Sequence, residues 1–166
     1  MNNSTSTLQP MKSITGIEEQ ASQALVKQLN QLLADFQIYY QNLRGFHWNI
    51  SGPGFFELHR HFETLYTAAQ LTIDELAERI LTLGGRPLHT MSDYVKSADI
   101  KESRDVFTAD ETVRTTLSNI AVLLQLEREI VVAANEAGDE GTADLLTPLI
   151  AVQEKQAWML KAYLGR

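Results

Sequence analysis

Residues 55–85 read FFELHRHFETLYTAAQLTIDELAERILTLGG, and this stretch decides the fold. Its apolar residues recur every three or four positions, which is the spacing of one face of an α-helix. Gly84 and Gly85, followed closely by Pro87, are typical of the end of a helix. We therefore expect one long helix from about residue 54 to about residue 83. Its predicted buried stripe consists of Phe62, Tyr66, Ala69, Ile73, Leu76 and Ile80.

Two pairs of metal-binding side chains lie beside this stripe. His59 and Glu63 are four residues apart, as are Asp74 and Glu78, so the two members of each pair share one side of the helix. The pairs are separated by about 16 Å, at a rise of about 1.5 Å per residue, so one ion cannot contact both pairs within one chain. If all four side chains serve one centre, half of them must come from a second, antiparallel copy of the helix. The spacing therefore predicts a two-fold metal site between subunits.

An ordinary di-iron centre inside the bundle is not expected. Such centres usually take a Glu from two helices and a Glu-x-x-His motif from each of the other two. The chain contains no Glu-x-x-His motif. This absence argues against such a centre.

Three further long helices are predicted from the rest of the sequence, and no strand pattern competes with them. The first runs from about residue 17 to about residue 50, carries His47 in its last turn and ends at the SGPG sequence of residues 51–54. The third begins at Thr108 and Glu111, which have the spacing of a capping box, and ends near Gly138.

The fourth helix and the long connection complete the predicted architecture. The helix is expected from about Thr142 to Leu164, and Pro148 within it predicts either a kink or a later start. A connection of about 25 residues joins the second and third helices, and residues 91–97 are expected to form a short helix inside it. The predicted fold class is therefore an all-α, ferritin-like four-helix bundle with a short extra helix in the long connection between the second and third helices.

The composition suits one soluble domain. The chain has 166 residues, of which 44% are hydrophobic, and no apolar run approaches the length of a bilayer span. Residues 1–16 are polar and are expected to form a flexible tail, followed by the bundle domain over residues 17–166. The first residues lack the basic and apolar regions of a secretory signal, so we expect a cytoplasmic protein without a membrane partner.

The cysteine count and the net charge limit the kinds of reactive site and of binding partner that the chain can have. The absence of cysteine excludes disulfides, cysteine-based zinc sites, thiol catalysis and iron–sulfur clusters. The formal net charge is −7, and the first 16 residues contain one cation, Lys12. Binding to DNA requires clustered Lys and Arg, so we expect it to be weak or absent.

Several short segments resemble the Dps mini-ferritins, both in their residues and in the gaps between them. They are Phe46-His47-Trp48-Asn49, Phe55-Phe56-Glu57-Leu58-His59, Phe62-Glu63, Asp74-Glu75-Leu76-Ala77-Glu78-Arg79-Ile80 and Leu83-Gly84-Gly85. The resemblance extends over about residues 20–164, the region of the predicted bundle. It implies a hollow shell of twelve subunits that oxidises Fe(II), stores the ferric product and so protects the cell from oxidative damage.

The resemblance also implies the composition of the ferroxidase centre. His47 and His59 of one subunit would meet Asp74 and Glu78 of the partner subunit, and Glu63 would complete the centre. The family often has Asp in place of Glu63, and its longer side chain leaves open whether it binds iron directly or through water. Carboxylates and neutral imidazoles suit Fe(II). Hydrogen peroxide would be the preferred oxidant and oxygen the alternative, and zinc or another divalent metal is an alternative occupant.

Trp48 has two interpretations. It lies beside His47 and would serve as an electron donor, or it fills space as a large aromatic side chain near a helix end. His61 and His89 have no matching partner pattern and are interpreted as surface or structural residues.

An acidic cluster is expected at the turn between the third and fourth helices. It contains Asp139, Glu140 and Asp144. The resemblance places this turn near a three-fold pore through which iron enters, with Asp144 as the favoured pore residue. Acidic residues in a first turn also stabilise the helix N-terminus, so both interpretations stay open.

Two alternative functions stay open as well. One is a nucleoid-associated structural shell with little ferroxidase activity, which protects by covering DNA. The other is a plain helical bundle without metal, which predicts a monomer or a small oligomer and makes the ligand spacing an accident.

Overall fold

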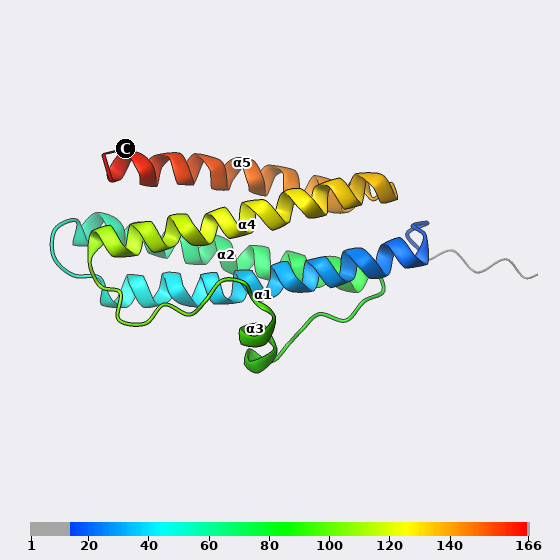
Figure 1. Cartoon of the computed structure of the whole chain (residues 1–166), viewed down its shortest axis with the longest axis horizontal. Helices are drawn as coiled ribbons and strands as arrows, with labels where there is room; N and C mark the ends of the chain where they lie inside the picture. Colours follow the sequence, from blue (N-terminus) through cyan, green and yellow to red (C-terminus); the bar gives the residue numbers. More distant parts are fainter. Residues whose placement is uncertain (1–13, 166) are drawn as a thin grey trace, which may run out of the picture.

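The computed structural model describes residues 14–165, which form five helices and, within that range, no strand. Four long helices form a bundle, namely α1 (Glu19–Asn49), α2 (Phe55–Thr82), α4 (Ala109–Ala137) and α5 (Glu140–Tyr163) (Figure 1). The short α3 (Met91–Ser97) lies outside the bundle and contacts α1. The predicted all-α bundle with an extra helix in the long connection is confirmed. Residues 1–13 of the expected tail lie outside the described residues.

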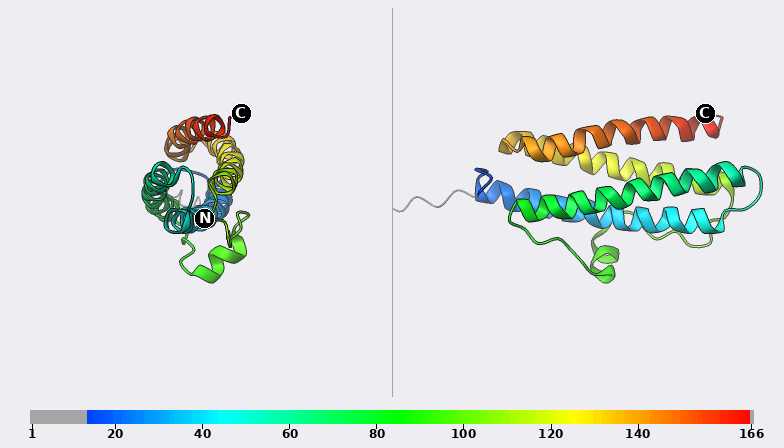
Figure 2. Two further views of the ribbon diagram at one scale, coloured as in Figure 1. Left: turned by 90° about the vertical axis from the view of Figure 1, so that its left-hand side faces the viewer. Right: turned by 180° about the vertical axis from the view of Figure 1, so that it is seen from behind.

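The core lies between the long helices. α1 packs against α2 and α4, and α4 packs against α5, as the end-on view of Figure 2 shows. The stripe predicted on α2 faces this core. Its buried members are Phe62, Ala69, Leu76 and Ile80, and its half-buried members are Tyr66 and Ile73. Burying one large apolar side chain completely contributes about 1.5–3 kcal/mol, so this stripe fixes the orientation of α2.

The long connection follows α1 because polar side chains of α1 bind its backbone (Figure 1). The amide of Leu88 donates to Oδ1 of Asn30 over 2.8 Å. The amide of Ile100 donates to Oδ1 of Asp35, also over 2.8 Å. Asn42 bonds two further backbone groups of the connection. These bonds satisfy backbone groups that would otherwise lack partners, and they hold the connection in place.

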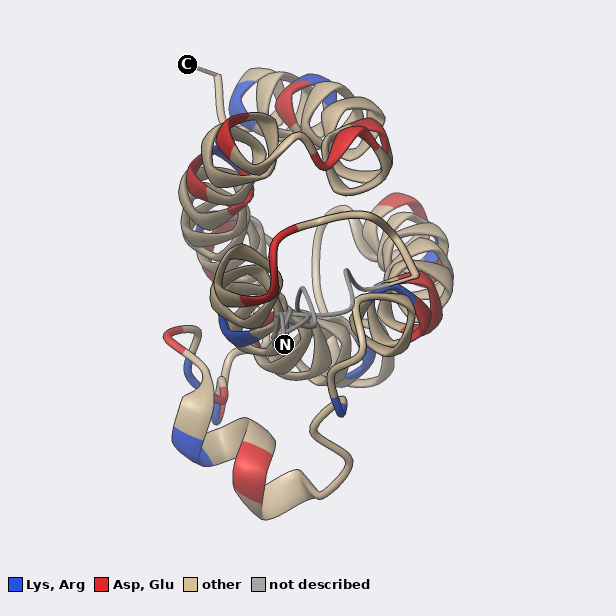
Figure 3. Cartoon of the chain, turned by 90° about the vertical axis from the view of Figure 1, so that its right-hand side faces the viewer, with Lys and Arg blue, Asp and Glu red and all other residues tan. Residues whose placement is uncertain are grey.

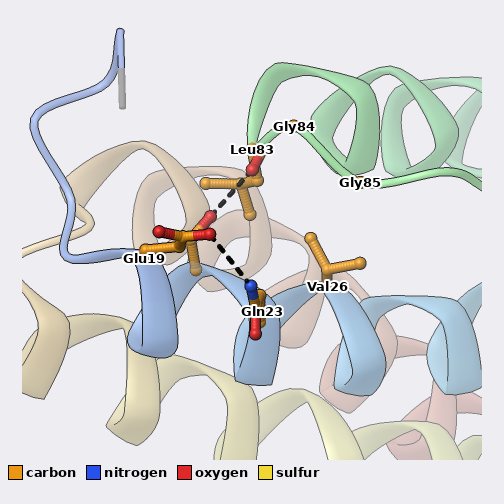
Figure 4. Close-up of a pocket in the computed structure, with 7 residues that line it drawn as sticks. Glu19, Gln23, Val26, Leu83, Gly84 and Gly85 are labelled. Carbon is orange, nitrogen blue, oxygen red and sulfur yellow. Dashed lines mark hydrogen bonds between the residues drawn. The ribbon is translucent and has the colours of Figure 1, made fainter. Parts of the chain in front are cut away.

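The end of α2 packs tightly against the start of α1. Oγ of Ser22 donates to the carbonyl oxygen of Leu83 over 2.8 Å. A Cβ atom on Gly85 would lie 2.4 Å from Cγ1 of Val26, so glycine is required for this approach. A surface pocket of about 410 Å³ lies at this junction, with the residues around it shown in Figure 4.

The predicted start of α4 is confirmed, and Thr108 and Glu111 form the capping box. α5 begins slightly earlier than expected, at Glu140, and continues through Pro148, so the later start that was one prediction for Pro148 is wrong. Pro148 has no N–H to donate to the carbonyl oxygen of Asp144. Both residues are exposed, so water can solvate that carbonyl. None of the helices within residues 14–165 has the length and apolarity that a membrane crossing requires.

Candidate metal centre

His47 and His59 lie face to face where α1 turns into α2. Their ring centroids are 3.9 Å apart and their ring planes differ by 18°. The chain reverses within a few residues because Gly52 and Gly54 adopt φ angles of 87° and 82°, which other residues rarely adopt. Two of the predicted ligands, one from each helix, are therefore adjacent within a single chain.

Each of these imidazoles bonds to the backbone of the other histidine. Nδ1 of His47 lies 2.7 Å from the carbonyl oxygen of His59, and Nδ1 of His59 lies 2.8 Å from the carbonyl oxygen of His47. A carbonyl oxygen only accepts hydrogen bonds, so each Nδ1 carries the hydrogen and donates it. In a neutral imidazole the lone pair is then on Nε2, which is the form that binds a metal ion.

The same hydrogen bonds stabilise the C-terminal end of α1. The last four carbonyl oxygens of an α-helix have no partner within the helix, and that of His47 is one of them. Nδ1 of His59 provides the missing donor. The ring of His59 is also stacked on Phe55, with centroids 5.2 Å apart. The hairpin between α1 and α2 therefore fixes the orientation of both histidine rings.

The predicted carboxylate ligands lie along the solvent side of α2. Glu63, Asp74 and Glu78 are exposed, whereas the two histidines are half-buried. Within residues 14–165 of one chain, no group of three or more His, Cys, Asp or Glu side chains could hold a metal ion. The single chain thus brings together His47 and His59 from the predicted set. Imidazole nitrogen and carboxylate oxygen are donors that Fe(II) accepts, so the residue types fit an iron substrate.

Further aromatic rings continue from the histidine pair. Tyr66 meets His47 edge-to-face at a centroid distance of 5.4 Å, and Tyr40 meets Tyr66 in the same way at 6.1 Å. Cζ of Arg44 lies 5.2 Å from the ring centroid of Tyr40 and 4.6 Å from that of Trp48. Trp48 is 56% exposed. Its indole therefore packs on a guanidinium group at the surface.

The three acidic residues at the α4–α5 turn have different surroundings, at the end of the bundle that Figure 3 faces. Asp139 is 2% exposed, caps α5 by accepting from the amide of Thr142 over 3.0 Å, and forms an ion pair with Arg79 of α2. Glu140 and Asp144 are exposed. Asp139 therefore joins α5 to α2, and only the other two acidic side chains are available to a pore.

The sequence interpretation missed a buried carboxylate between α4 and α5. Glu127 is 0% exposed, and its Oε1 accepts from Nε2 of Gln153 over 2.5 Å. Burial raises the pKa of Glu127 to about 7, although the hydrogen bond from Gln153 acts in the opposite direction. The sequence does indicate that Glu127 is buried, because it falls in the same helical register as the buried Ile120 and Ile130.

The two remaining histidines differ in exposure. His61 is half-buried, and its Nε2 is enclosed without a hydrogen-bond partner among the described residues. Burial lowers the pKa of His61. His89 is exposed on the connection between α2 and α3.

Residues 26–166 match the Ferritin family model, which describes a ferritin-like domain. The four-helix bundle and this match define a ferritin-like protein. A DNA protection during starvation protein from Porphyromonas gingivalis is 45% identical over 150 residues, which cover 90% of this chain and 94% of that protein. The chain belongs to the Dps family of ferritin-like proteins.

Solved structures agree with this assignment. The Dps protein from Vibrio cholerae O1, described as a member of a broad superfamily of ferritin-like diiron-carboxylate proteins, has a TM-score of 0.90 and 47% identity to this chain. The match covers 94% of this chain and 99% of that one. A Dps protein from Bacillus brevis has a TM-score of 0.85 and 40% identity, and the match covers 87% of this chain and 97% of that one.

Proposed function

We propose that this protein stores iron and limits oxidative damage by oxidising Fe(II) and keeping the ferric product inside a shell of its own copies. Membership of the Dps family supports iron storage and oxidative protection in general. The description of the Vibrio cholerae relative as a ferritin-like diiron-carboxylate protein supports ferroxidase chemistry. A homododecamer in the cytoplasm is part of the proposal.

The observation that carries the proposal is the reciprocal bonding of His47 and His59. Both rings are held with Nδ1 donating to a carbonyl oxygen, which leaves the Nε2 lone pairs to bind metal. Two imidazoles are too few to hold iron firmly, so we assign the remaining ligands to Asp74 and Glu78 of a second copy. Glu63, four residues from His59 on α2, completes the centre directly or through water.

In the proposed reaction, the chain binds iron as a substrate and controls where its electrons go. The histidine nitrogens bind Fe(II), while the carboxylate oxygens of Asp74 and Glu78 favour Fe(III), so the ligand set promotes oxidation. Hydrogen peroxide is the proposed oxidant, with oxygen as the slower alternative. Two ferrous ions supply both electrons that peroxide needs to become water, so no hydroxyl radical is released. Trp48, next to His47, has two open roles, electron donation to the site and packing near the end of α1.

The test is Fe(II) oxidation by stoichiometric hydrogen peroxide without oxygen, followed by size-exclusion chromatography with iron detection. A His47→Ala, Asp74→Ala double variant is compared with wild type. The matched control is a His89→Ala, Glu75→Ala double variant, which removes an exposed imidazole and an exposed carboxylate. Wild type and control should oxidise Fe(II) rapidly, with iron in a shell-sized peak. The site variant should lose this activity, and equal slow oxidation in all three proteins would contradict the proposal.

A further inference from the structure

His47, Tyr66 and Tyr40 form a continuous path of ring contacts from the histidine pair. The His47 and Tyr66 planes are 78° apart at a centroid distance of 5.4 Å, and the Tyr66 and Tyr40 planes are 80° apart at 6.1 Å. Both distances lie in the contact range of edge-to-face aromatic pairs. Both tyrosines are half-buried. A phenol that can be oxidised is therefore in direct contact with one of the two histidine rings that offer nitrogen to iron.

Trp48 is less well placed to give up an electron. Cζ of Arg44 lies 4.6 Å from the centroid of its ring. A cation is attracted to the negative face of an aromatic ring, so it opposes the positive charge that forms when an indole loses an electron. Oxidised tyrosine instead loses its phenolic proton and ends neutral. Tyr66 contacts His47, and among the described residues Arg44 lies over the rings of Tyr40 and Trp48 but not over that of Tyr66, so the cation opposes the oxidation of Tyr66 less.

We infer that Tyr66 donates one electron to hydrogen peroxide when a site holds a single Fe(II). The inference rests on the proposed function, in which peroxide reacts at the His47 and His59 site. Reduction of peroxide to water needs two electrons, and one Fe(II) supplies only one. Tyr66 supplies the second, so the O–O bond breaks without release of hydroxyl radical.

The atoms and charges of this step balance. One Fe(II), the phenol of Tyr66, one hydrogen peroxide and one proton from solvent give one Fe(III), the neutral Tyr66 phenoxyl radical and two waters. The phenolic proton and the solvent proton join the two hydrogens of the peroxide in these waters. A later Fe(II) returns an electron to the radical, which takes up a proton and becomes tyrosine again.

The test uses the full-length protein loaded without oxygen with one Fe(II) per site and mixed with one equivalent of hydrogen peroxide. Samples are frozen for electron paramagnetic resonance, and parallel samples contain a spin trap for hydroxyl radical. Wild type should give a tyrosyl radical and little trapped hydroxyl radical. Tyr66→Phe, which keeps the ring but lacks the hydroxyl, should lose most of the tyrosyl signal and trap several-fold more hydroxyl radical.

Control variants separate this role from damage to the site. Trp48→Phe and Tyr94→Phe, the latter on α3, should keep the tyrosyl signal. Zn²⁺ affinity measured by calorimetry should be the same for Tyr66→Phe and wild type, because the ring contact with His47 is retained. An undiminished tyrosyl signal in Tyr66→Phe, or its loss in Trp48→Phe, would overturn the inference.

The two proposals fail in different ways. A wild-type protein that oxidises Fe(II) rapidly but forms no tyrosyl radical overturns the role of Tyr66 and leaves the proposed function standing. A wild-type protein that does not oxidise Fe(II) with peroxide overturns both.

Discussion

Nε2 of Gln153 on α5 donates a hydrogen bond to Oε1 of Glu127 on α4, and both side chains are buried between the helices. Oε2 of Glu127 and the amide oxygen of Gln153 are enclosed and have no hydrogen-bond partner among the described residues. Both atoms are acceptors when Glu127 is ionised. Protonation of Glu127 converts one enclosed acceptor into a donor, which makes the neutral acid the better-suited form in the folded protein.

Protonation of Glu127 should make stability depend on pH. The pKa of Glu127 is raised from 4.5 to about 7 on folding, mainly by burial. A raised pKa means that the folded state holds a proton that the unfolded state has lost. The resulting stability is fully present below pH 4.5 and is lost as the pH rises through about 7. One pKa unit corresponds to about 1.4 kcal/mol, so the loss is on the order of 3 kcal/mol per subunit.

Replacing Glu127 with Gln should abolish this loss, because glutamine cannot ionise and can donate to the amide oxygen of Gln153. Urea denaturation at pH 5 and pH 8, at one fixed protein concentration, gives the two free energies of unfolding. From pH 5 to pH 8, the free energy of unfolding should fall in wild type but not in Glu127→Gln. It should fall as in wild type in the control Glu136→Gln, which changes an exposed residue on the same helix. If the free energy of unfolding changes equally between the two pH values in wild type and in Glu127→Gln, Glu127 is not the group responsible.

Replacing Asp139 with Ala should destabilise the protein substantially. The change removes the cap of α5 and leaves Arg79 without its carboxylate partner. Loss of a cap and of a largely buried ion pair costs at least about 2 kcal/mol. Thermal denaturation should show this as a lower melting temperature. The control is Glu140→Ala, an exposed neighbour that should change stability by less than about 0.5 kcal/mol. Equal effects of the two changes would argue against the role of Asp139.

Mixing two inactive variants should restore activity if the centre is shared between subunits. His47→Ala and Asp74→Ala each damage every site of a uniform two-fold pair. In a mixed pair, one site contains both substitutions and the other contains neither. Co-expressed variants should therefore regain part of the wild-type rate of Fe(II) oxidation, whereas each variant alone stays inactive. A co-expressed sample as inactive as its parents would contradict a centre that is shared between subunits.

Asp144→Asn should slow the entry of iron if the α4–α5 turn lines a pore. Asp144 is exposed near the start of α5, where a carboxylate attracts cations. The initial rate of iron uptake at low Fe(II) concentration measures the effect. The exposed Glu154→Gln on the same helix is the control and should leave the rate unchanged. An unaltered rate in Asp144→Asn would leave only the stabilisation of the helix N-terminus as the role of this residue.

Binding of duplex DNA should be weak at physiological salt. Each chain has a formal net charge of −7, so the proposed shell should repel a polyanion. A gel shift with and without Mg²⁺ tests this expectation. Tight binding at moderate salt without Mg²⁺ would refute it and would favour the alternative of a DNA-covering shell with little ferroxidase activity.

The sequence predicts what depends on local periodicity. The stripe that includes Phe62 and Leu76 and the capping box at Thr108 depend on residues within a few turns of one helix, and both were predicted. The backbone bonds of His47 could not be predicted, because they depend on how the turn at residues 50–54 places one helix end against another. The same holds for Asn30, whose partner lies far along the chain.

Polar residues on buried faces were the hardest to interpret. Asp35 lies in a run of buried residues of α1, where it binds the amide of Ile100. A sequence pattern shows that such a residue points inward, but not what it meets there. Glu127 follows the same rule, since its partner Gln153 comes from another helix. Spacing therefore predicts candidate ligands, while tertiary contacts alone show which rings and carboxylates are held in place.

In the proposed metal centre, the hydrogen bonds of His47 and His59 would link folding of the hairpin to metal binding. Their carbonyl bonds form only when the ends of α1 and α2 are docked, and these bonds also orient both rings. An ion that binds there as proposed would meet nitrogens that are already oriented, so ordering them would cost little of the binding free energy. Any change that loosens the turn at residues 50–54 would weaken metal capture well before the bundle unfolds. In the proposed centre, the rigidity of this hairpin would therefore contribute to the affinity for metal.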